Sequence, residues 1–253
     1  MKKLTCCYLI STLILLLFVT ACATKPKVQK KRQEEALRNL GERYMVQGNY
    51  TAALKEFLKA EQLYPQDPLL QYDLGLVYVA KERFDLAIRQ FKKAIEINPG
   101  YAAAKNSLAA VYLVEKEWDI AIPILKEVAE DLLDPTPHIP LSNLGWAYYN
   151  RKDYGLAEKY YSAALKKEPK YILALRGLGR TYLATGQPVA AVGVFEKAVQ
   201  SEPGLAELHF DLARSYALSG NYKKARDAYQ KVIEIDPDTP LAEKARKGIK
   251  KIK

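Results

Sequence analysis

Small and apolar residues recur along the chain with a period of about 34 residues. The recurring motif is Leu, then Gly or Ala, then Tyr three residues later, as in "LGERY" and "LGLVY". Its second residue is Gly41, Gly75, Ala109, Gly145, Gly179 or Ala213, at successive spacings of 34, 34, 36, 34 and 34. Leu and Tyr at this spacing share one face of a helix, with a gap between them at the small residue. The period therefore predicts a repeated helical unit.

The same features follow each motif. Alanine stands twelve residues after the small residue in every copy, and a large side chain stands sixteen residues after it: Phe57, Phe91, Leu125, Tyr161, Phe195 and Tyr229. Turn-forming stretches such as "QGNY" and "RKDY" come between, and a proline follows the second apolar segment. Each repeat is predicted to be two helices, with the large side chain of the second filling the gap in the first.

This pattern resembles the tetratricopeptide repeat family in six copies, at 34–67, 68–101, 102–137, 138–171, 172–205 and 206–239. The resemblance implies an all-α fold, a right-handed superhelical solenoid of helix-turn-helix repeats. Stacking is needed because one helix pair cannot bury its own apolar face. Residues 240–253 are expected to form a C-terminal capping helix, with Leu241, Ala245, Ile249 and Ile252 on one face and lysines on the other.

In tetratricopeptide proteins the second, fifth, ninth, twelfth and thirteenth positions of each repeat line a concave groove that binds a partner. By this resemblance the expected partner-binding residues are Leu69, Tyr72, Leu76, Leu113, Trp146, Tyr149, Arg176, Arg180 and Arg214. Aromatic and arginine side chains dominate the energetics of protein interfaces. We therefore expect a peptide or helix with its apolar face on Trp146 and Tyr72, and an acidic group near Arg176 or Arg180. The alternative is that stacking of the repeats buries some of these side chains.

The family also includes members that hold a partner's C-terminal carboxylate in a clamp of lysine and asparagine spread over the first three repeats. In this chain Arg38 is the only basic residue expected to line the groove there. Capture of a C-terminal carboxylate is therefore not expected.

Residues 1–21 have the pattern of an export signal. Lys2 and Lys3 precede a nearly unbroken apolar run over 8–19, which is shorter than the roughly 20 residues of a spanning helix. The following Val19, Thr20, Ala21 and Cys22 resemble a bacterial lipobox, in which the cysteine thiol is alkylated with diacylglycerol and becomes the first mature residue. A thiolate is the nucleophile that this step needs. Cleavage after Ala21 that leaves an ordinary cysteine, and a retained transmembrane helix, are the alternatives.

Lipidation would anchor the chain to a membrane through Cys22 and the basic tether 22–33. Two or more acyl chains, at about 0.8 kcal/mol per buried methylene, hold a protein stably. In lipobox proteins of Gram-negative envelopes an aspartate after the cysteine commonly means retention at the inner membrane, and Ala23 stands here instead. The resemblance thus favours an outer-membrane lipoprotein that faces the periplasm.

The net charge of +10 comes from the two ends of the chain. Basic residues concentrate in 25–32 and 240–253, so the repeats between them are close to neutral. This distribution argues against a nucleic-acid partner and is typical of solvated end segments; attraction of the tether to anionic lipid head groups is the functional alternative.

Residues suited to catalysis are scarce. Cys6 and Cys7 leave with the signal, His138 and His209 are the only histidines and are expected at the surface, and no phosphate loop or metal-ligand motif occurs. No enzyme activity, cofactor, metal site or small-molecule substrate is predicted.

The lipobox, the tether and the six repeats together resemble the type IV pilus biogenesis and stability lipoproteins, the pilotins. Like them, the chain has a proline-bearing extension, in "DLLDPTPHIP", before an asparagine-containing "LSNLG" helix; the family's frequent "NYG" run is "NSLAA" here. The resemblance implies a protein partner, an outer-membrane secretin subunit. A general envelope adaptor, serving barrel assembly or cell-wall hydrolases, is the alternative, and a module associated with glycan-processing enzymes is a more distant one.

Replacement of Cys22 tests the anchor. A Cys22→Ala protein should fold, because the repeats do not include this residue, but should carry no lipid and leave the membrane fraction. Mass spectrometry and detergent partitioning measure both effects. Full retention of the variant in detergent-extracted membranes would show that the anchoring argument is wrong.

Overall fold

The computed structural model describes residues 26, 28–131 and 135–252. Residues 1–21, Cys22 and part of the tether, on which the signal and lipidation predictions fall, lie outside this range. Throughout the described residues the regular secondary structure is helical, which confirms the all-α prediction. None of these helices is both long and apolar enough to cross a membrane. The chain divides after Val111 into two compact units.

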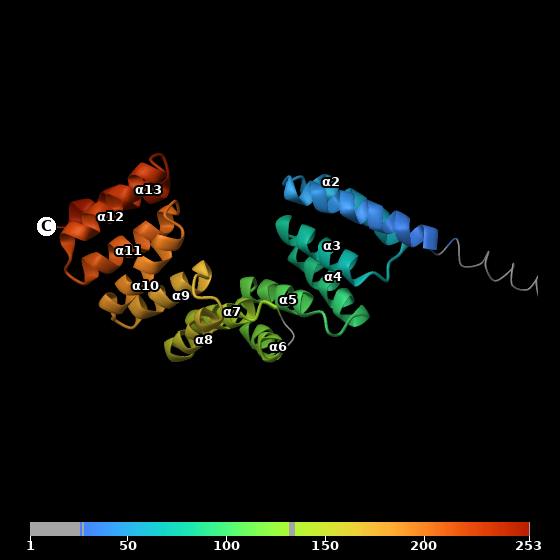
Figure 1. The fold of residues 1–253 in the computed structure, drawn as a ribbon, viewed down its shortest axis with the longest axis horizontal. Coiled ribbons are helices and arrows are strands. Elements are labelled where there is room, and N and C mark those ends of the chain that lie inside the picture. Colours follow the sequence, from blue (N-terminus) through green and yellow to red (C-terminus); the bar gives the residue numbers. More distant parts are fainter. Residues whose placement is uncertain (1–25, 27, 132–134, 253) are drawn as a thin grey trace, which may run out of the picture. The chain divides into compact units, whose positions relative to one another are not determined.

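The first unit begins with a helix over 28–46, so helical structure starts inside the segment expected to be a tether. It continues with α2 (Tyr50–Leu63), α3 (Pro68–Ala80) and α4 (Phe84–Ile97), and the chain divides within α5 (Ala102–Val114). Helix α3 packs against both α2 and α4 (Figure 1). Asp67 begins α3 by accepting a hydrogen bond from the amide of Leu69 at 2.9 Å.

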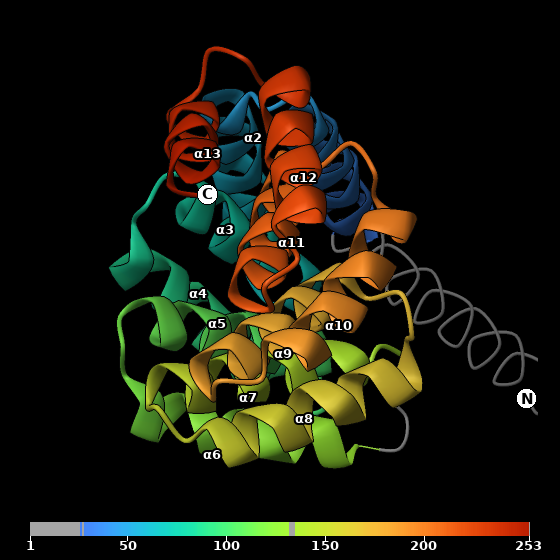
Figure 2. The ribbon, with the colours of Figure 1, turned by 90° about the vertical axis from the view of Figure 1, so that its left-hand side faces the viewer.

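The second unit contains helices α6 to α13. Their bounds are α6 (Trp118–Glu130), α7 (His138–Asn150), α8 (Tyr154–Lys167), α9 (Ile172–Ala184), α10 (Pro188–Ser201), α11 (Ala206–Leu218), α12 (Tyr222–Ile235) and α13 (Pro240–Lys251). Each helix packs against the next, and Figure 2 shows α13 beside α12 at the end of the series. Helix α13 buries Ala242 and Ala245 and carries lysines in its last turn, as a capping helix should.

The predicted contact between the small residue and the large side chain holds the helix pairs together. A methyl group added at Gly41 would lie 2.4 Å from the ring of Phe57, and one at Gly75 would lie 2.4 Å from the ring of Phe91. Both rings are fully buried. Glycine is needed at these positions because any β-carbon would overlap the ring.

The last repeat uses a different glycine. Ala213 replaces the motif glycine there, and the ring of Tyr229 packs instead against Gly248 of α13, where an added methyl group would come within 2.6 Å. The terminal repeat is therefore closed by the capping helix rather than by its own first helix alone.

The turn inside each repeat has one residue in the left-handed region, always seven positions after the motif's small residue. Three of these residues are glycines, with φ of 72° to 82°, and the others are Glu82, Lys116 and Lys152, with φ of 56° to 64°. A residue with a β-carbon pays about 1–2 kcal/mol for this conformation. The non-glycine turns are therefore strained.

Substitution of Lys116 by glycine should relieve that strain. Relief of the strain should contribute about 1–2 kcal/mol, and the greater freedom of glycine in the unfolded chain should cost about 0.5–1 kcal/mol. The free energy of unfolding should therefore rise by about 0.5–1 kcal/mol. Thermal and urea unfolding would measure it. The control is Glu115→Gly at the adjacent turn residue, whose φ is not positive, and which should lose stability. Equal effects of the two substitutions would contradict the strain argument.

Candidate functional site

A pocket of about 270 Å³ lies in the second unit between α7, α8 and α9. Helix α7 contributes Ser142, Asn143, Trp146 and Tyr149, helix α8 contributes Tyr161, and helix α9 contributes Leu173, Arg176, Gly177 and Arg180. Four of these residues, Trp146, Tyr149, Arg176 and Arg180, were predicted from the sequence to bind a partner. The fold brings these four together on two consecutive repeats.

The aromatic side of the pocket is held by contacts between rings. Trp146 packs edge-on against Trp118, with 6.0 Å between the ring centroids, yet keeps 38% of its surface exposed. Tyr149 makes a similar contact with Tyr154 at 5.6 Å. Leu173 is 61% exposed. Partly exposed apolar side chains that are already held in place lose little entropy when a ligand covers them.

The floor of the pocket is formed by Tyr161, which is 3% exposed. Its ring fits against two glycines, since a methyl group at Gly145 would approach within 2.7 Å and one at Gly177 within 2.1 Å. Burial raises the pKa of the Tyr161 hydroxyl, and Tyr149 adds to the effect while Arg180 opposes it. The hydroxyl is therefore a neutral hydrogen-bonding group at physiological pH.

The polar side of the pocket is an arginine pair on one buried carboxylate. Arg176 Nε donates to Asp211 Oδ2 at 2.9 Å, and Arg180 Nη2 lies 3.0 Å from the same oxygen. Asp211, on α11, is 1% exposed, whereas the two arginine side chains are 30% and 42% exposed. Two guanidinium groups share one carboxylate, so the pocket keeps positive charge that can attract an anionic group.

The other predicted residues lie elsewhere. Leu69, Tyr72 and Leu76 are on α3 of the first unit, where Leu69 is 45% exposed. Arg214, on α11, is exposed but is not among the residues lining the pocket.

Leu113 was predicted to line the binding surface, and this is wrong because its side chain is only 1% exposed. Val111 and Tyr112 are buried as well, so the end of α5 is covered on several sides, and the exposed residue there is Val114. The surface prediction for His209 was also wrong: it is 8% exposed, and its Nε2 lies 2.9 Å from the carbonyl oxygen of Pro203.

Sequence reasoning missed Asp211, although a signal for it exists. Arg176 stands three residues before a motif glycine, and Asp211 stands two residues before the small residue of the next repeat, 35 positions later. Arg38 and Asp73 stand in the same two places in the first repeats, and they also pair, with 3.5 Å between Nη1 and Oδ2. An arginine and an aspartate at this spacing therefore indicate an ion pair between repeats.

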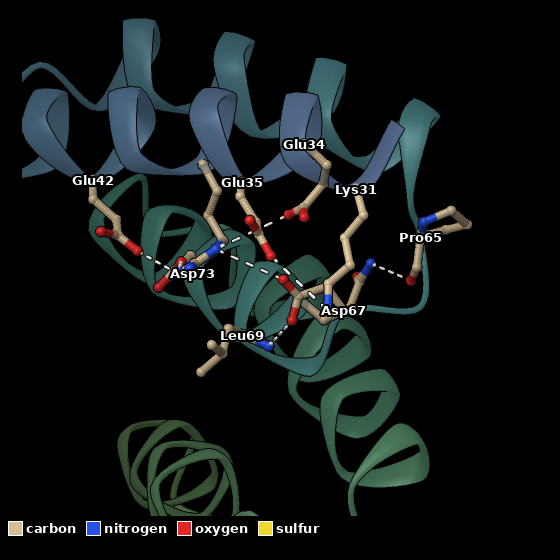
Figure 3. A network of polar contacts seen from close by, with 10 residues as sticks. Lys31, Glu34, Glu35, Glu42, Pro65, Asp67, Leu69 and Asp73 are labelled. Atoms are coloured by element: carbon tan, nitrogen blue, oxygen red, sulfur yellow. Dashed lines mark hydrogen bonds and ion pairs between the residues drawn. The ribbon is translucent and has the colours of Figure 1, made fainter. Parts of the chain in front are cut away.

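In the first unit the same ion pair is surrounded by more acids (Figure 3). Arg38 Nη1 donates to Glu42 at 2.5 Å, and Arg38 Nε lies 3.7 Å from Asp67 and 4.0 Å from Glu34. We call Arg38 with Glu34, Glu42, Asp67 and Asp73 the acidic network.

Two carboxyl groups of this network hold protons at unusually high pH. Burial raises the pKa of Glu34 to about 7, and Asp67 adds to the shift while Arg38 opposes it. Burial also raises the pKa of Asp73 to about 7, with Glu42 adding to it. Glu34 is thus paired with Asp67, and Asp73 with Glu42. Ionisation of all four carboxyl groups around one guanidinium group is unfavourable because like charges repel. Among the described residues, no group of three or more histidine, cysteine and acidic side chains is placed to hold a metal ion.

The comparisons with known proteins agree with the repeat pattern. Three family models described as tetratricopeptide repeats match residues 41–81 and 75–113, 142–206 and 183–247. An Arabidopsis thaliana CTR9 homolog is 28% identical over 123 residues, which is 45% of this chain, and mouse tetratricopeptide repeat protein 8 is 30% identical over 93 residues, which is 37%. The matches span only 11% and 18% of those relatives.

Three solved structures are matched over nearly their full length. PilW, a type IV pilus biogenesis factor, has a TM-score of 0.78 at 21% identity, covering 84% of this chain and 98% of PilW. Pseudomonas aeruginosa pilF has a TM-score of 0.74 at 18% identity, covering 87% and 99%. YrrB, a repeat protein with an unusual peptide-binding site, has a TM-score of 0.55 at 22% identity, covering 76% and 97%. At these identities the likeness demonstrates a shared fold.

The raised pKa values predict that the first unit loses stability as pH rises. The folded chain keeps protons on Glu34 and Asp73 up to pH near 7, whereas the unfolded chain releases them near pH 4–4.5. Stability should therefore fall between about pH 4.5 and 7 and then level off. Because one pKa unit corresponds to about 1.4 kcal/mol and both groups are shifted upward, the loss should exceed about 2 kcal/mol.

Hydrogen exchange of helix 28–46, corrected for intrinsic rates, would measure this loss between pH 5 and pH 8. Glu34→Gln should remove much of it, and Glu35→Gln, at a half-exposed neighbour, should not. A Glu34→Gln protein as pH-dependent as the wild type would show that burial of this carboxyl group is not the cause.

Proposed function

Because the chain belongs to the tetratricopeptide repeat family, we propose that it binds a protein partner in the pocket of α7, α8 and α9, and that it does so as a pilotin for a type IV pilus secretin. In this role Cys22 would carry acyl chains that hold the protein at the outer membrane, facing the periplasm. The protein would capture a secretin subunit and deliver it to the site of ring assembly. This is binding work that makes or breaks no covalent bond.

The observation that carries the proposal is the composition of the pocket. The pocket is lined both by half-exposed Trp146 and by the arginine pair, so it combines an apolar, aromatic surface with positive charge. Tryptophan and arginine are the side chains most often found at the energetic centre of protein interfaces. The pocket therefore suits a segment with an apolar side chain next to an acidic one.

The pilus assignment rests on similarity of the whole fold and on features of the sequence outside the pocket. The pilus biogenesis factor PilW and the protein pilF share this fold over nearly their whole length, and the sequence adds the lipobox and the proline-bearing extension before α7. A small peptide-binding repeat protein also shares the fold, which supports peptide binding more generally.

Affinity capture from detergent-solubilised envelopes tests both parts. The full chain should recover a secretin, and Trp146→Ala should recover it at least ten-fold less well, because truncation of a central aromatic residue costs about 2 kcal/mol. Leu218→Ala is the control, because Leu218 is 62% exposed and lies outside the pocket. Thermal unfolding would verify that both variants fold.

Two results would count against this function. If Trp146→Ala recovered as much secretin as the wild type, the secretin would bind at a site other than the pocket. Recovery of barrel-assembly or wall-hydrolase components in place of a secretin would replace the pilotin role by that of a general envelope adaptor.

A further inference from the structure

The two ion pairs between repeats have opposite surroundings. Arg38, Glu42 and Asp73 occupy the same repeat positions as Arg176, Arg180 and Asp211. The residue four positions after the first arginine is glutamate in one case and arginine in the other. Where the second unit sets two guanidinium groups on one carboxylate, the acidic network sets four carboxyl groups around one guanidinium.

Within the acidic network one carboxyl group is buried without a hydrogen bond. Glu34 is fully buried, neither of its side-chain oxygens accepts a hydrogen bond, and the nearest cation is Arg38 Nε at 4.0 Å. Its side chain points into the network (Figure 3). The Nε of Arg38 is likewise buried without a hydrogen bond. Buried polar groups without hydrogen bonds are costly, so a ligand that donates hydrogen bonds to the network would stabilise it.

The network reaches the surface beside aromatic rings. The Glu42 side chain is 43% exposed, and those of Asp67 and Asp73 are 13% exposed. Tyr72 and Tyr101 pack together, with 5.2 Å between their centroids. Burial raises the pKa of the Tyr101 hydroxyl, and Tyr72 and Asp73 add to the shift. Tyr72 directly precedes Asp73 on α3, so the ring pair lies next to the network along the chain.

We propose that the acidic network, with Tyr72 and Tyr101 beside it, binds a lysine or arginine side chain of a protein segment. The carboxylates would receive charge-assisted hydrogen bonds, the rings would face the cation, and the half-exposed Leu69 nearby on α3 would contact the apolar part of the segment. The bound cation would take the place of protons that the carboxyl pairs hold near neutral pH.

The proposal rests on the proposed function only in taking a protein segment as the occupant. It adds that the first unit selects a basic segment, whereas the pocket of the second unit selects an acidic one. Failure of secretin capture, or an unaltered secretin complex with Trp146→Ala, would not contradict the proposal for the acidic network.

Isothermal titration of the full, detergent-solubilised chain with acetyl-AKLAKA-amide tests it, with acetyl-AELAEA-amide as the matched acidic peptide. The basic peptide should bind, and Asp73→Asn and Glu42→Gln should each weaken it at least five-fold. The apparent enthalpy at pH 7 should differ between phosphate and Tris buffers, because binding releases protons. Asp85→Asn, at an exposed carboxylate of α4, should bind like the wild type.

Three results would overturn the proposal: no binding of the basic peptide, wild-type affinity in both Asp73→Asn and Glu42→Gln, or equal weakening by Asp85→Asn. Putrescine is a further arm, and if it binds as tightly as the peptide the occupant is a free amine rather than a protein segment. Glu42 lies partly at the surface, so wild-type affinity in Glu42→Gln alone overturns the proposal if Asp73→Asn does not fold.

Discussion

In four of the repeats a large ring fills the gap beside a motif glycine, and the other features of those helix pairs depend on this contact. At Gly75 and Phe91 the ring takes the space of a β-carbon, so it fixes both how closely the two helices approach and how the first is rotated. Rotation then determines where the rest of the first helix points. Trp146 and Arg180 each follow a buried motif glycine by one residue, and both therefore reach the pocket.

The ion pair between repeats shows how one backbone arrangement can serve opposite charges. Arg38 with Asp73 and Arg176 with Asp211 have the same spacing and both join consecutive first helices. The residue between them in the repeat, Glu42 or Arg180, sets the sign of the local charge. A buried carboxylate that pairs with two arginines leaves positive charge at the surface. Where four carboxyl groups surround one arginine, two of them have raised pKa values and hold protons instead. Partner choice can thus change without change to the fold.

This separation between packing and surface explains the pattern of similarity. The structures of the pilus biogenesis factor PilW and of pilF match the fold over nearly their whole length at about one fifth identity. The residues that must be kept are the small residue, the ring and the turn, a few in each repeat of about 34. The exposed positions of the first helices are free to differ, and in repeat proteins these are the positions that meet partners.

The sequence by itself determined the helix pairs, the ring contacts and the capping helix, because each depends on residues at short, fixed separations along the chain. It also brought Trp146, Tyr149, Arg176 and Arg180 into one predicted surface, since repeat register sets the direction of each side chain. Tertiary structure alone decided that Leu113 is covered, that Asp211 holds the arginines, and that Glu34 is buried without a hydrogen bond. Those outcomes depend on which side chains neighbouring repeats place against one another, and on how much water they exclude, neither of which a periodic pattern specifies.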